Sequence, residues 1–249
     1  MKLLKYLANL GYGTRRDVAR MLADGRVCVA DGSKLRDGDG VAHDDIRLDG
    51  APLDPAPGVV IMLHKPPDTV CSTKGPERLV YELLPPRFLL RSPVLATVGR
   101  LDRETTGLLL LTDDGVLNHR LTSPRSHVAK TYRATLATAL HDHDLQRLAA
   151  GTLCLAGETS PLMPALLEML DECIVLVTIA EGRYHQVRRM FAAVGNHVTA
   201  LHRVQVGTLT LGELPPGDWR VLDADDVARL FAPATSRPAS YPISSPAAP

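Results

Sequence analysis

Residues 99–115 read Gly-Arg-Leu-Asp-Arg-Glu-Thr-Thr-Gly-Leu-Leu-Leu-Leu-Thr-Asp-Asp-Gly. The stretch places one carboxylate, Asp102, between Arg100 and Arg103, and the apolar run after it predicts a buried strand over residues 107–112. Neighbouring guanidinium groups favour an ionised carboxyl group, and a carboxylate kept charged in a partly dry site can act as a nucleophile. Taken alone, an aspartate after Arg-Leu is typical of an exposed turn. Whether Asp102 is a nucleophile therefore has to be decided from the rest of the chain.

The composition is that of a globular protein with a hydrophobic core. The chain has 249 residues, enough for one large domain and a small one, and 45% of them are hydrophobic. No apolar run approaches the length that spans a bilayer, and the apolar stretch at the start is too short and interrupted for a secretory signal. The four cysteines form no Cys-x-x-Cys pair, which favours reduced thiols. We therefore expect a cytoplasmic protein.

Charge is balanced over the whole chain but not along it. Lysine and arginine together number 28, as do aspartate and glutamate, so the formal net charge is zero. A neutral total argues against an indiscriminate, purely electrostatic binder of nucleic acid. Residues 1–26 nevertheless carry six basic and two acidic side chains, whereas residues 44–54 and 223–226 are acidic. The basic surplus near the start of the chain is therefore the candidate surface for a polyanion.

The first 57 residues predict a small unit of two helices and a short sheet. Leucines at helical spacing predict a helix over residues 3–10, which the following glycines can end. Thr14, with Asp17 three residues later, predicts the N-cap of a second helix. Residues 26–30 alternate like a strand.

A larger unit is predicted beyond a Pro-rich linker. Residues 52–58 are the predicted linker, residues 58–232 a single domain, and residues 233–249, rich in Pro, Ala and Ser, a disordered tail. The predicted strands are Val59–Leu63, Gly107–Thr112, Lys130–Leu136, Ile174–Ile179 and Val198–Arg203. The predicted helices are Gly115–Leu121, His141–Ala150, Tyr184–Val194 and Asp225–Phe231. Because strands and helices mix without regular alternation, the fold class is α+β, with a largely antiparallel mixed sheet and flanking helices.

A second candidate site residue lies on the strand predicted at residues 130–136, which begins Lys-Thr-Tyr-Arg. Along a strand, Tyr132, Ala134 and Leu136 share one face. A tyrosine on such a face either packs in the core or stacks on a base and offers its hydroxyl group to a proton. In isolation, the core position is the commoner of the two.

A third candidate is the string Glu-Gly-Arg-Tyr-His-Gln-Val-Arg-Arg-Met-Phe at residues 181–191. Its glycine, Gly182, is expected to let the backbone approach closely, and His185 is the predicted start of a helix. On that helix Arg188 and Arg189 project in different directions and can serve different tasks. A single arginine here is typical of a solvated helix face, whereas the whole string is uncommon.

The remaining patterns are weaker. Lys65, in the run His-Lys-Pro-Pro after the first strand of the large domain, is expected either to support the site or to touch RNA. His141 and His143 have no third ligand at a familiar spacing, and the sequence lacks a phosphate-binding loop and a dinucleotide fingerprint. We therefore expect neither a metal nor a nucleotide cofactor.

These motifs, in this order and at these separations, resemble those of the pseudouridine synthase family. Residues 1–57 resemble the ribosomal S-four-type RNA-binding domain, with Leu4 as a departure where relatives often have an acidic residue. Ala129 departs in the same way before the Lys-x-Tyr motif. The resemblance covers the chain except its tail, and it implies that residues 58–232 form a pseudouridine synthase catalytic domain.

The resemblance also implies roles for particular residues. Asp102 is the expected nucleophile, Tyr132 is expected to stack on the target base, and Arg188 is expected to pair with the aspartate and orient it. Arg100 is expected to occupy space near the flipped base. The side chains expected to contact substrate or RNA are Arg100, Arg103, Lys65, Lys130, Arg183, His185, Arg189, Arg15, Arg16, Arg20 and Arg26.

Within the family, residues 183–197 look most like the branch that modifies small-subunit ribosomal RNA. The resemblance thus implies isomerisation of a uridine in 16S ribosomal RNA, at a site of the uridine-516 type. The alternatives are a synthase acting on large-subunit 23S RNA, a non-catalytic RNA-binding assembly factor, and a small-molecule enzyme that shares the fold. The expected partner is ribosomal RNA, free or in a partly assembled particle, with no membrane and no cofactor, and we expect a monomer.

Overall fold

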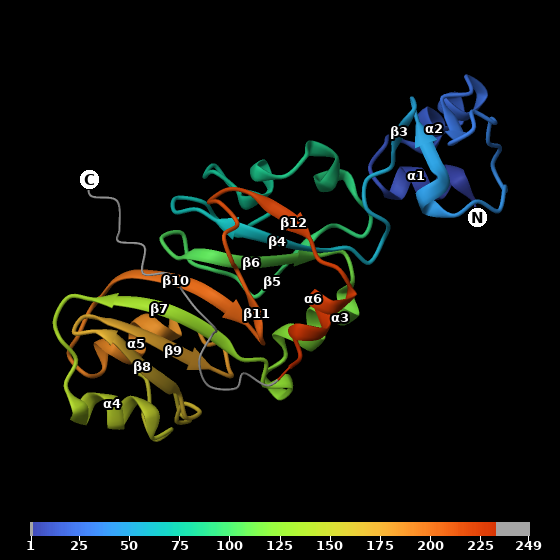
Figure 1. Ribbon diagram of the computed structural model, residues 1–249. Helices are drawn as coiled ribbons and strands as arrows, with labels where there is room; N and C mark the ends of the chain where they lie inside the picture. The colour runs from blue at the N-terminus through green and yellow to red at the C-terminus, as the bar shows by residue number, and fades with distance from the viewer. Residues whose placement is uncertain (1, 233–249) are drawn as a thin grey trace. The chain divides into compact units, whose positions relative to one another are not determined.

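The computed structural model describes residues 2–232 (Figure 1). The tail predicted to be disordered, residues 233–249, lies outside the described residues. The chain divides into two compact units. The first holds the residues up to Glu104, Leu109–Thr122 and Leu214–Asp223, and the second holds Thr105–Leu108, Ser123–Glu213 and the residues from Ala224 on. No described helix combines the length and the apolar character that crossing a membrane requires.

The first unit begins with the two helices and the short sheet that the sequence predicts. Helix α1 spans Leu3–Asn9, α2 spans Arg15–Ala23 and the 3-10 helix η1 spans His43–Asp45. Strands β1 (Val27–Val29), β2 (Ile46–Leu48) and β3 (Ala51–Pro52) pair antiparallel in that order. Their shared core consists of side chains with no exposed surface, among them Leu3, Leu7, Leu10, Val18, Val27 and Ile46.

The start of α2 is fixed by the predicted cap. The Asp17 backbone N–H donates to Thr14 Oγ1 at 3.2 Å, and the Thr14 backbone N–H donates to Asp17 Oδ2 at 3.0 Å. This reciprocal capping box satisfies two backbone donors that the first helical turn leaves without partners. The prediction of a helix beginning after Thr14 is therefore confirmed.

The rest of the first unit is built on β4 and the end of β6. Their strand order is β12–β4–β6, with β5 beside β6. Strand β4 (Val60–Lys65) pairs antiparallel with β12 (Trp219–Val221), and β5 (Ala96–Val98) pairs antiparallel with residues 110–112 of β6 (Thr106–Thr112). The helices are η2 (Val80–Leu83), η3 (Pro86–Leu90) and α3 (Gly115–Thr122). Asp114 caps α3 by accepting the backbone N–H groups of Val116 and Leu117 at 2.8 and 3.0 Å.

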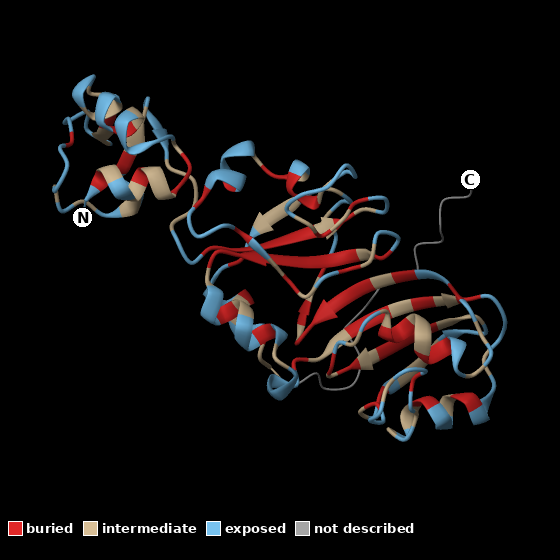
Figure 2. Cartoon of the chain, turned by 180° about the vertical axis from the view of Figure 1, so that it is seen from behind, coloured by how far each residue is buried: buried red, intermediate tan, exposed pale blue. Residues whose placement is uncertain are grey.

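The second unit starts from the first residues of β6. The strand order is β6–β10–β7–β9–β8, with β11 beside β10. The strands are β7 (Lys130–Leu136), β8 (Leu166–Asp171), β9 (Ile174–Ile179), β10 (Val198–Val206) and β11 (Leu209–Thr210); the helices are η4 (Pro124–Ser126), α4 (Asp142–Ala149), α5 (Gln186–Ala192) and α6 (Ala224–Arg229). The pair β6–β10 is parallel and the other pairs are antiparallel. Figure 2 shows buried residues concentrated in the strands β6, β10, β7 and β9. The mixed, largely antiparallel sheet confirms the predicted α+β class.

Gly107 lets β6 and β10 approach closely. It pairs with Arg203 in the parallel ladder and has a φ of 103°. A Cβ added at this position would collide with the backbone of Arg203. A glycine is therefore required in the middle of the Thr-Thr-Gly-Leu run, for its backbone conformation and for the space that it leaves.

Most predicted elements are confirmed, and the exceptions have local causes. Strand β8 was not predicted because its sequence, Leu-Leu-Glu-Met-Leu-Asp, does not alternate and it lies at the edge of the sheet. Strands β5 and β12 have three residues each, too few to show a period. The helix predicted over Tyr184–Val194 begins only at Gln186, because His185 has a left-handed φ of 48°.

A buried ion pair holds the predicted linker, residues 52–58. The side chains of Arg91 and Asp113 are 1% and 3% exposed, and their charged groups lie 2.8 Å apart. Arg91 also donates to the carbonyl oxygens of two linker residues at 2.9 and 3.2 Å, and Asp113 accepts the backbone N–H of Gly58 at 2.8 Å. These hydrogen bonds supply what a buried ion pair needs to offset the loss of water. The linker is therefore anchored to this ion pair through its backbone carbonyl and N–H groups.

We predict that Asp113→Asn destabilises the protein by about 3 kcal/mol, because the buried Arg91 charge would lose its counterion. Chemical denaturation measures the loss, and limited proteolysis should show faster cleavage within residues 52–58. Asp49→Asn is the matched control, since it removes the carboxylate of an exposed pair with Arg26 and should leave stability nearly unchanged. Equal effects of the two substitutions would contradict the anchoring role.

Candidate active site

Asp102 lies in the loop between β5 and β6 and is half-buried, whereas Arg100 beside it is exposed. The ion pairs of Arg103 are with Asp68 and Glu104. Its guanidinium group lies 2.8 Å from the Asp68 carboxylate and 3.5 Å from that of Glu104. The expected support of Asp102 by Arg103 stays a prediction, and the direct ion pairs of Arg103 are with other carboxylates. Its predicted RNA contact stays a prediction, since the side chain is 59% exposed.

Lys65 holds the backbone next to Asp102. It is fully buried at the end of β4, and its Nζ donates to the carbonyl oxygens of Arg103 at 2.9 Å and Pro66 at 3.1 Å. Burial lowers the pKa of Lys65, and nearby acidic groups, Asp102 among them, oppose that shift. A fully buried ammonium group cannot reach RNA, so the predicted RNA contact of Lys65 is wrong. The alternative, support of the site, agrees with these hydrogen bonds.

Tyr132 lies on β7 with its side chain buried, as the alternation of the strand predicts. Its cross-strand partner on β10 is Arg203, which is 1% exposed. The Arg203 guanidinium carbon lies 5.9 Å from the centre of the tyrosine ring, and its Nη1 lies 3.5 Å from the hydroxyl oxygen. Arg203 Nε also donates to the carbonyl oxygen of Leu108 on β6 at 2.7 Å. The arginine therefore positions the tyrosine, by a cation–π contact and a long hydrogen bond.

Sequence reasoning missed Arg203. The strand predicted over residues 198–203 ended at this residue, which made it a terminal arginine of the kind that normally meets solvent. In the structure β10 continues to Val206, so Arg203 lies inside the strand. The residues that follow, Val204, Gln205 and Val206, alternate as a continuing strand does, and this alternation was the available signal.

Lys130 begins β7 and is half-buried. Its Nζ donates to the carbonyl oxygen of Val128 at 2.8 Å. Burial, with a contribution from the positive charge of Arg203, lowers the pKa of Lys130 to about 8. This lysine is therefore partly neutral just above neutral pH, which weakens it as a phosphate ligand. Its predicted RNA contact stays a prediction.

Arg188 lies on α5 and donates to the carbonyl oxygen of Val198 at 2.9 Å, which ties the helix to the start of β10. The side chain is half-buried. Asp102 belongs to the first unit and Arg188 to the second. The predicted pairing of these two residues therefore stays a prediction.

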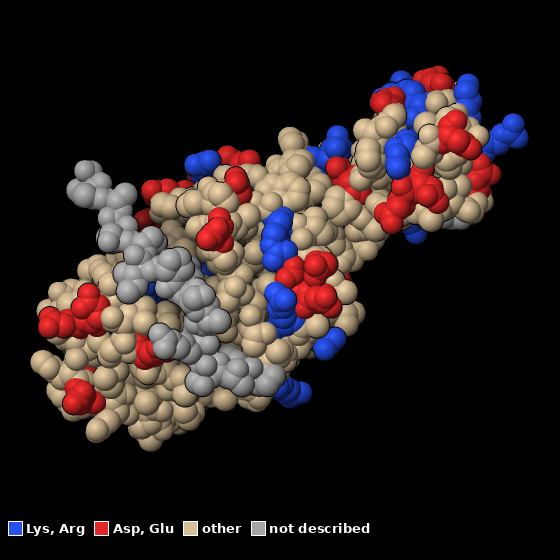
Figure 3. Space-filling model, in the orientation of Figure 1, with Lys and Arg blue, Asp and Glu red and all other residues tan. Residues whose placement is uncertain are grey.

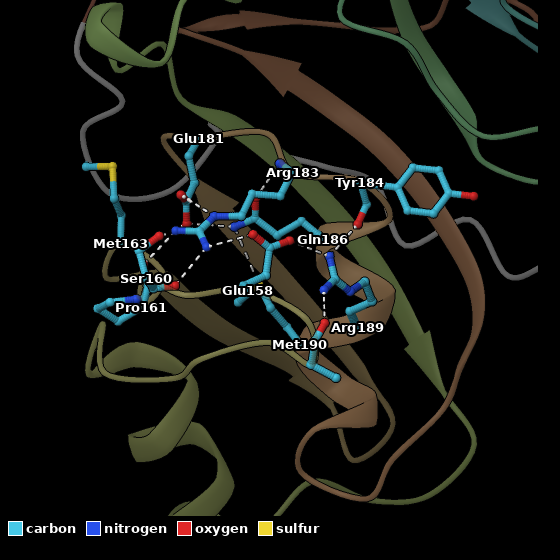
Figure 4. Close-up of polar contacts among 11 residues, drawn as sticks. Glu158, Ser160, Pro161, Met163, Glu181, Arg183, Tyr184, Gln186, Arg189 and Met190 are labelled. Carbon is cyan, nitrogen blue, oxygen red and sulfur yellow. Dashed lines mark hydrogen bonds and ion pairs between the residues drawn. The ribbon is translucent and has the colours of Figure 1, made fainter.

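Arg183 and Arg189, expected to contact phosphate, are held by acceptors of the protein itself (Figure 4). Both reach the carboxylate of Glu158, at 3.5 and 3.0 Å. Arg183 also donates to Glu181 at 3.2 Å and to the carbonyl oxygens of Ser160 and Pro161 at 2.9 and 2.6 Å. These contacts join the loop before β8 to the segment that leads into α5. A phosphate could bind these groups only by competing with their present partners.

His185 and Gly182 flank this network. His185 is half-buried, and its ring stacks on that of Tyr184. The expectation of a close backbone approach at Gly182 is wrong, because a Cβ added there would meet open space. The glycine is therefore not explained by crowding.

Four arginines of the first module, residues 1–57, were expected to contact RNA, and they divide into two pairs. Arg20 and Arg26 form exposed ion pairs with acidic side chains of the same module, at 3.0 and 2.6 Å. Arg15 and Arg16 are exposed, and neither lies within salt-bridge distance of a carboxylate in residues 2–232. Figure 3 shows Lys and Arg interspersed with Asp and Glu on this module. Arg15 and Arg16 are therefore the better placed of the four for a phosphate.

Comparison with known proteins identifies the family. The family described as RNA pseudouridylate synthase matches residues 59–193, which span Lys65, Asp102, Tyr132 and Arg188. The chain belongs to this family. It is an RNA pseudouridine synthase, an isomerase, as the resemblance implied. Among residues 2–232, no three His, Cys, Asp or Glu side chains converge as metal ligands would.

Curated relatives match the synthase almost from end to end. A ribosomal small subunit pseudouridine synthase A from Yersinia pestis is 43% identical over 94% of this chain and 99% of its own length. The protein of the same name from Escherichia coli K12 is 41% identical over 92% of this chain and its own full length. A crystal structure of a pseudouridylate synthase is 38% identical and superposes with a TM-score of 0.65, over 92% of this chain and 98% of that one.

We predict that Lys130 makes the stability of the synthase depend on pH between about 8 and 10.5. Its folded pKa lies below its ordinary value of 10.5, so the unfolded chain binds more protons in this window and stability rises with pH there. Below pH 8 the folded protein carries the full free-energy cost of burying the charged Lys130 side chain. Lys130→Met should remove the rise and stabilise the protein at pH 7 by about 2 kcal/mol, allowing for partial solvent screening.

Urea denaturation at pH 7, 8, 9 and 10 tests this prediction. Lys34→Met serves as the control, because it removes an exposed lysine of the first unit and should leave the rise intact. Parallel pH profiles for wild type and Lys130→Met would contradict the assignment.

Proposed function

We propose that this synthase isomerises a specific uridine of 16S ribosomal RNA, at a site of the uridine-516 type. The observation that carries the proposal is the extent of the match. The alignments with relatives named for the ribosomal small subunit cover 92–94% of this chain and 99–100% of the relatives' own lengths. The first module is included in that match, so the parts that would select the RNA are compared together with the catalytic residues.

In the proposed reaction the uracil ring leaves C1′ of its ribose and rejoins through C5. The N1–C1′ bond breaks and a C5–C1′ bond forms, while C5 loses a proton and N1 gains one. Asp102 either attacks as the nucleophile or abstracts a proton that exposes C1′. Because the product is an isomer of the substrate, the balance requires neither an oxidant nor a nucleotide.

The target base has to leave its stack, which costs a few kcal/mol and less in a loop or open junction. We assign Tyr132 as the ring that receives the base, since Arg203 and the strand fix its position. Arg100, which is exposed, is assigned to the space that the base vacates. Arg188 is assigned to orient Asp102. Lys65 supports the same carboxylate through the backbone that follows it.

The first 57 residues are proposed to bind the RNA as an S-four-type domain, and residues 58–232 to form the catalytic domain. The capped helix α2 presents Arg15 and Arg16 in its first turn. Basic side chains at a helix start can follow phosphates without reading bases. The zero net charge fits an enzyme that relies on a local basic face.

We predict that Asp102→Asn lowers the rate of pseudouridine formation by at least about 10³-fold, because the substitution keeps the shape and removes the negative charge. RNA affinity should persist. Asp68→Asn is the control, since Asp68 is an exposed carboxylate paired with Arg103, and the rate should stay within about twofold. Continued modification by Asp102→Asn would rule out the aspartate mechanism.

The target is tested by mapping pseudouridines in both ribosomal RNAs of a deletion strain and of the complemented strain. The proposal expects one site to be lost from 16S RNA. Loss of a site from 23S RNA instead would assign the enzyme to the large subunit. No loss in either RNA would favour a non-catalytic assembly factor.

We predict that the double substitution Arg15→Ala and Arg16→Ala weakens binding to 16S RNA fragments and reduces the slope of log K against log salt by about 1.5, the value for two lost phosphate contacts. The turnover rate at saturating RNA should not change. Lys34→Ala with Arg36→Ala removes the same charge from another exposed part of the module and is the control. Equal slopes for the two double variants would contradict a specific role for α2.

A further inference from the structure

Tyr184 is the unusual surface residue of the second unit. Its side chain is 76% exposed, and its ring stacks on that of His185, with centroids 3.9 Å apart and an angle of 16° between the planes. The other tyrosines among residues 2–232 are buried or half-buried. An aromatic ring that shows one face to solvent and is backed by a second ring is ready to accept a third flat group.

The backbone beneath this pair is held on both sides. The carbonyl oxygen of Tyr184 accepts a hydrogen bond from Arg189 at 3.1 Å. His185 has φ 48° and ψ 34°, a left-handed turn immediately before α5. The Arg183 N–H donates to the Gln186 side chain at 2.8 Å, and Gln186 donates to Glu181 at 2.9 Å. The turn is therefore fixed by side chains that lie before and after it.

Those side chains are themselves anchored. Arg189 donates to Glu158 at 3.0 Å and to the carbonyl oxygen of Ala156 at 2.6 Å. Glu181 is 9% exposed and accepts the backbone N–H of Met163 at 2.9 Å. Figure 4 shows these groups turned toward one another and the Tyr184 ring pointing away from them. The network thus uses its charges internally and presents a ring to solvent.

We propose that Tyr184, backed by His185, is a stacking platform for an unpaired base of the RNA substrate, separate from the target base. The proposal rests on the proposed function, because it takes RNA as the substrate. Stacking suits this surface since every nucleobase has a flat π face, and a ring fixed before binding loses little conformational entropy. The scaffold also gives Arg183 and Arg189 a role other than phosphate contact: they position the platform.

The experiment compares Tyr184→Ala, Tyr184→Phe and a control on a 16S RNA fragment that contains the target uridine. Tyr184→Ala should raise KM about tenfold, the effect of losing one base–aromatic stack, and leave kcat unchanged. Tyr184→Phe keeps the ring and should behave as wild type. Leu166→Ala removes another large exposed side chain of the same unit and should change neither constant.

A spectroscopic measurement reads the stack directly. In Tyr184→Trp combined with Asp102→Asn, the new indole should be quenched when RNA is added, and Asp102→Asn alone supplies the background of Trp219. Unchanged KM in Tyr184→Ala, failure of Tyr184→Phe to preserve KM, or an unquenched indole would each overturn the platform. If wild type does not modify the fragment, the proposed function has failed instead, so the two failures are distinguishable.

An alternative occupant is a protein partner of the ribosomal particle. In that case purified enzyme and naked RNA would show equal KM values for Tyr184→Ala and wild type, which overturns the RNA platform.

Discussion

Arg203 ties together the strands on either side of β10. Its Nε donates to the carbonyl oxygen of Leu108 on β6, and its guanidinium group lies over the Tyr132 ring on β7. Gly107, its ladder partner on β6, has no side chain, so the two backbones can approach. A charge placed here is tolerated only with such partners, because an uncompensated buried cation is costly. The position of Tyr132 depends on this arrangement.

Buried cations organise backbone elsewhere in the chain as well. Lys65 secures the loop that carries Asp102, and Arg91 secures the linker through Asp113 and two carbonyl oxygens. Arg183 and Arg189 are partly buried and hold the turn before α5. Basic residues that in an RNA-modifying enzyme suggest phosphate contact thus have structural tasks. The consequence is that fewer basic side chains remain available to a phosphate than a count of arginines indicates.

The sequence predicted the elements whose period or cap is local. Thr14 and Asp17 fix the start of α2 by hydrogen bonds within four residues. Tyr132, Ala134 and Leu136 share the buried face of β7, and β9 is an almost continuous apolar run. The features that the sequence did not predict depend on contacts between residues far apart in the chain. Neither the partners of Arg203 nor the anchoring of the linker by Arg91 could be predicted, since both depend on residues dozens of positions away.

The sequence by itself determined the family, the order of the motifs and the candidate residues Asp102, Tyr132 and Arg188, because these are carried by residue identity and spacing. The tertiary structure decided which basic side chains are committed to the protein and which remain exposed. Of the two roles open to Lys65, it favoured the buried support, and it showed Tyr184 as an exposed ring. The reason is physical: burial and hydrogen-bond partners are set by contacts between distant segments, and the identity of a residue does not specify them.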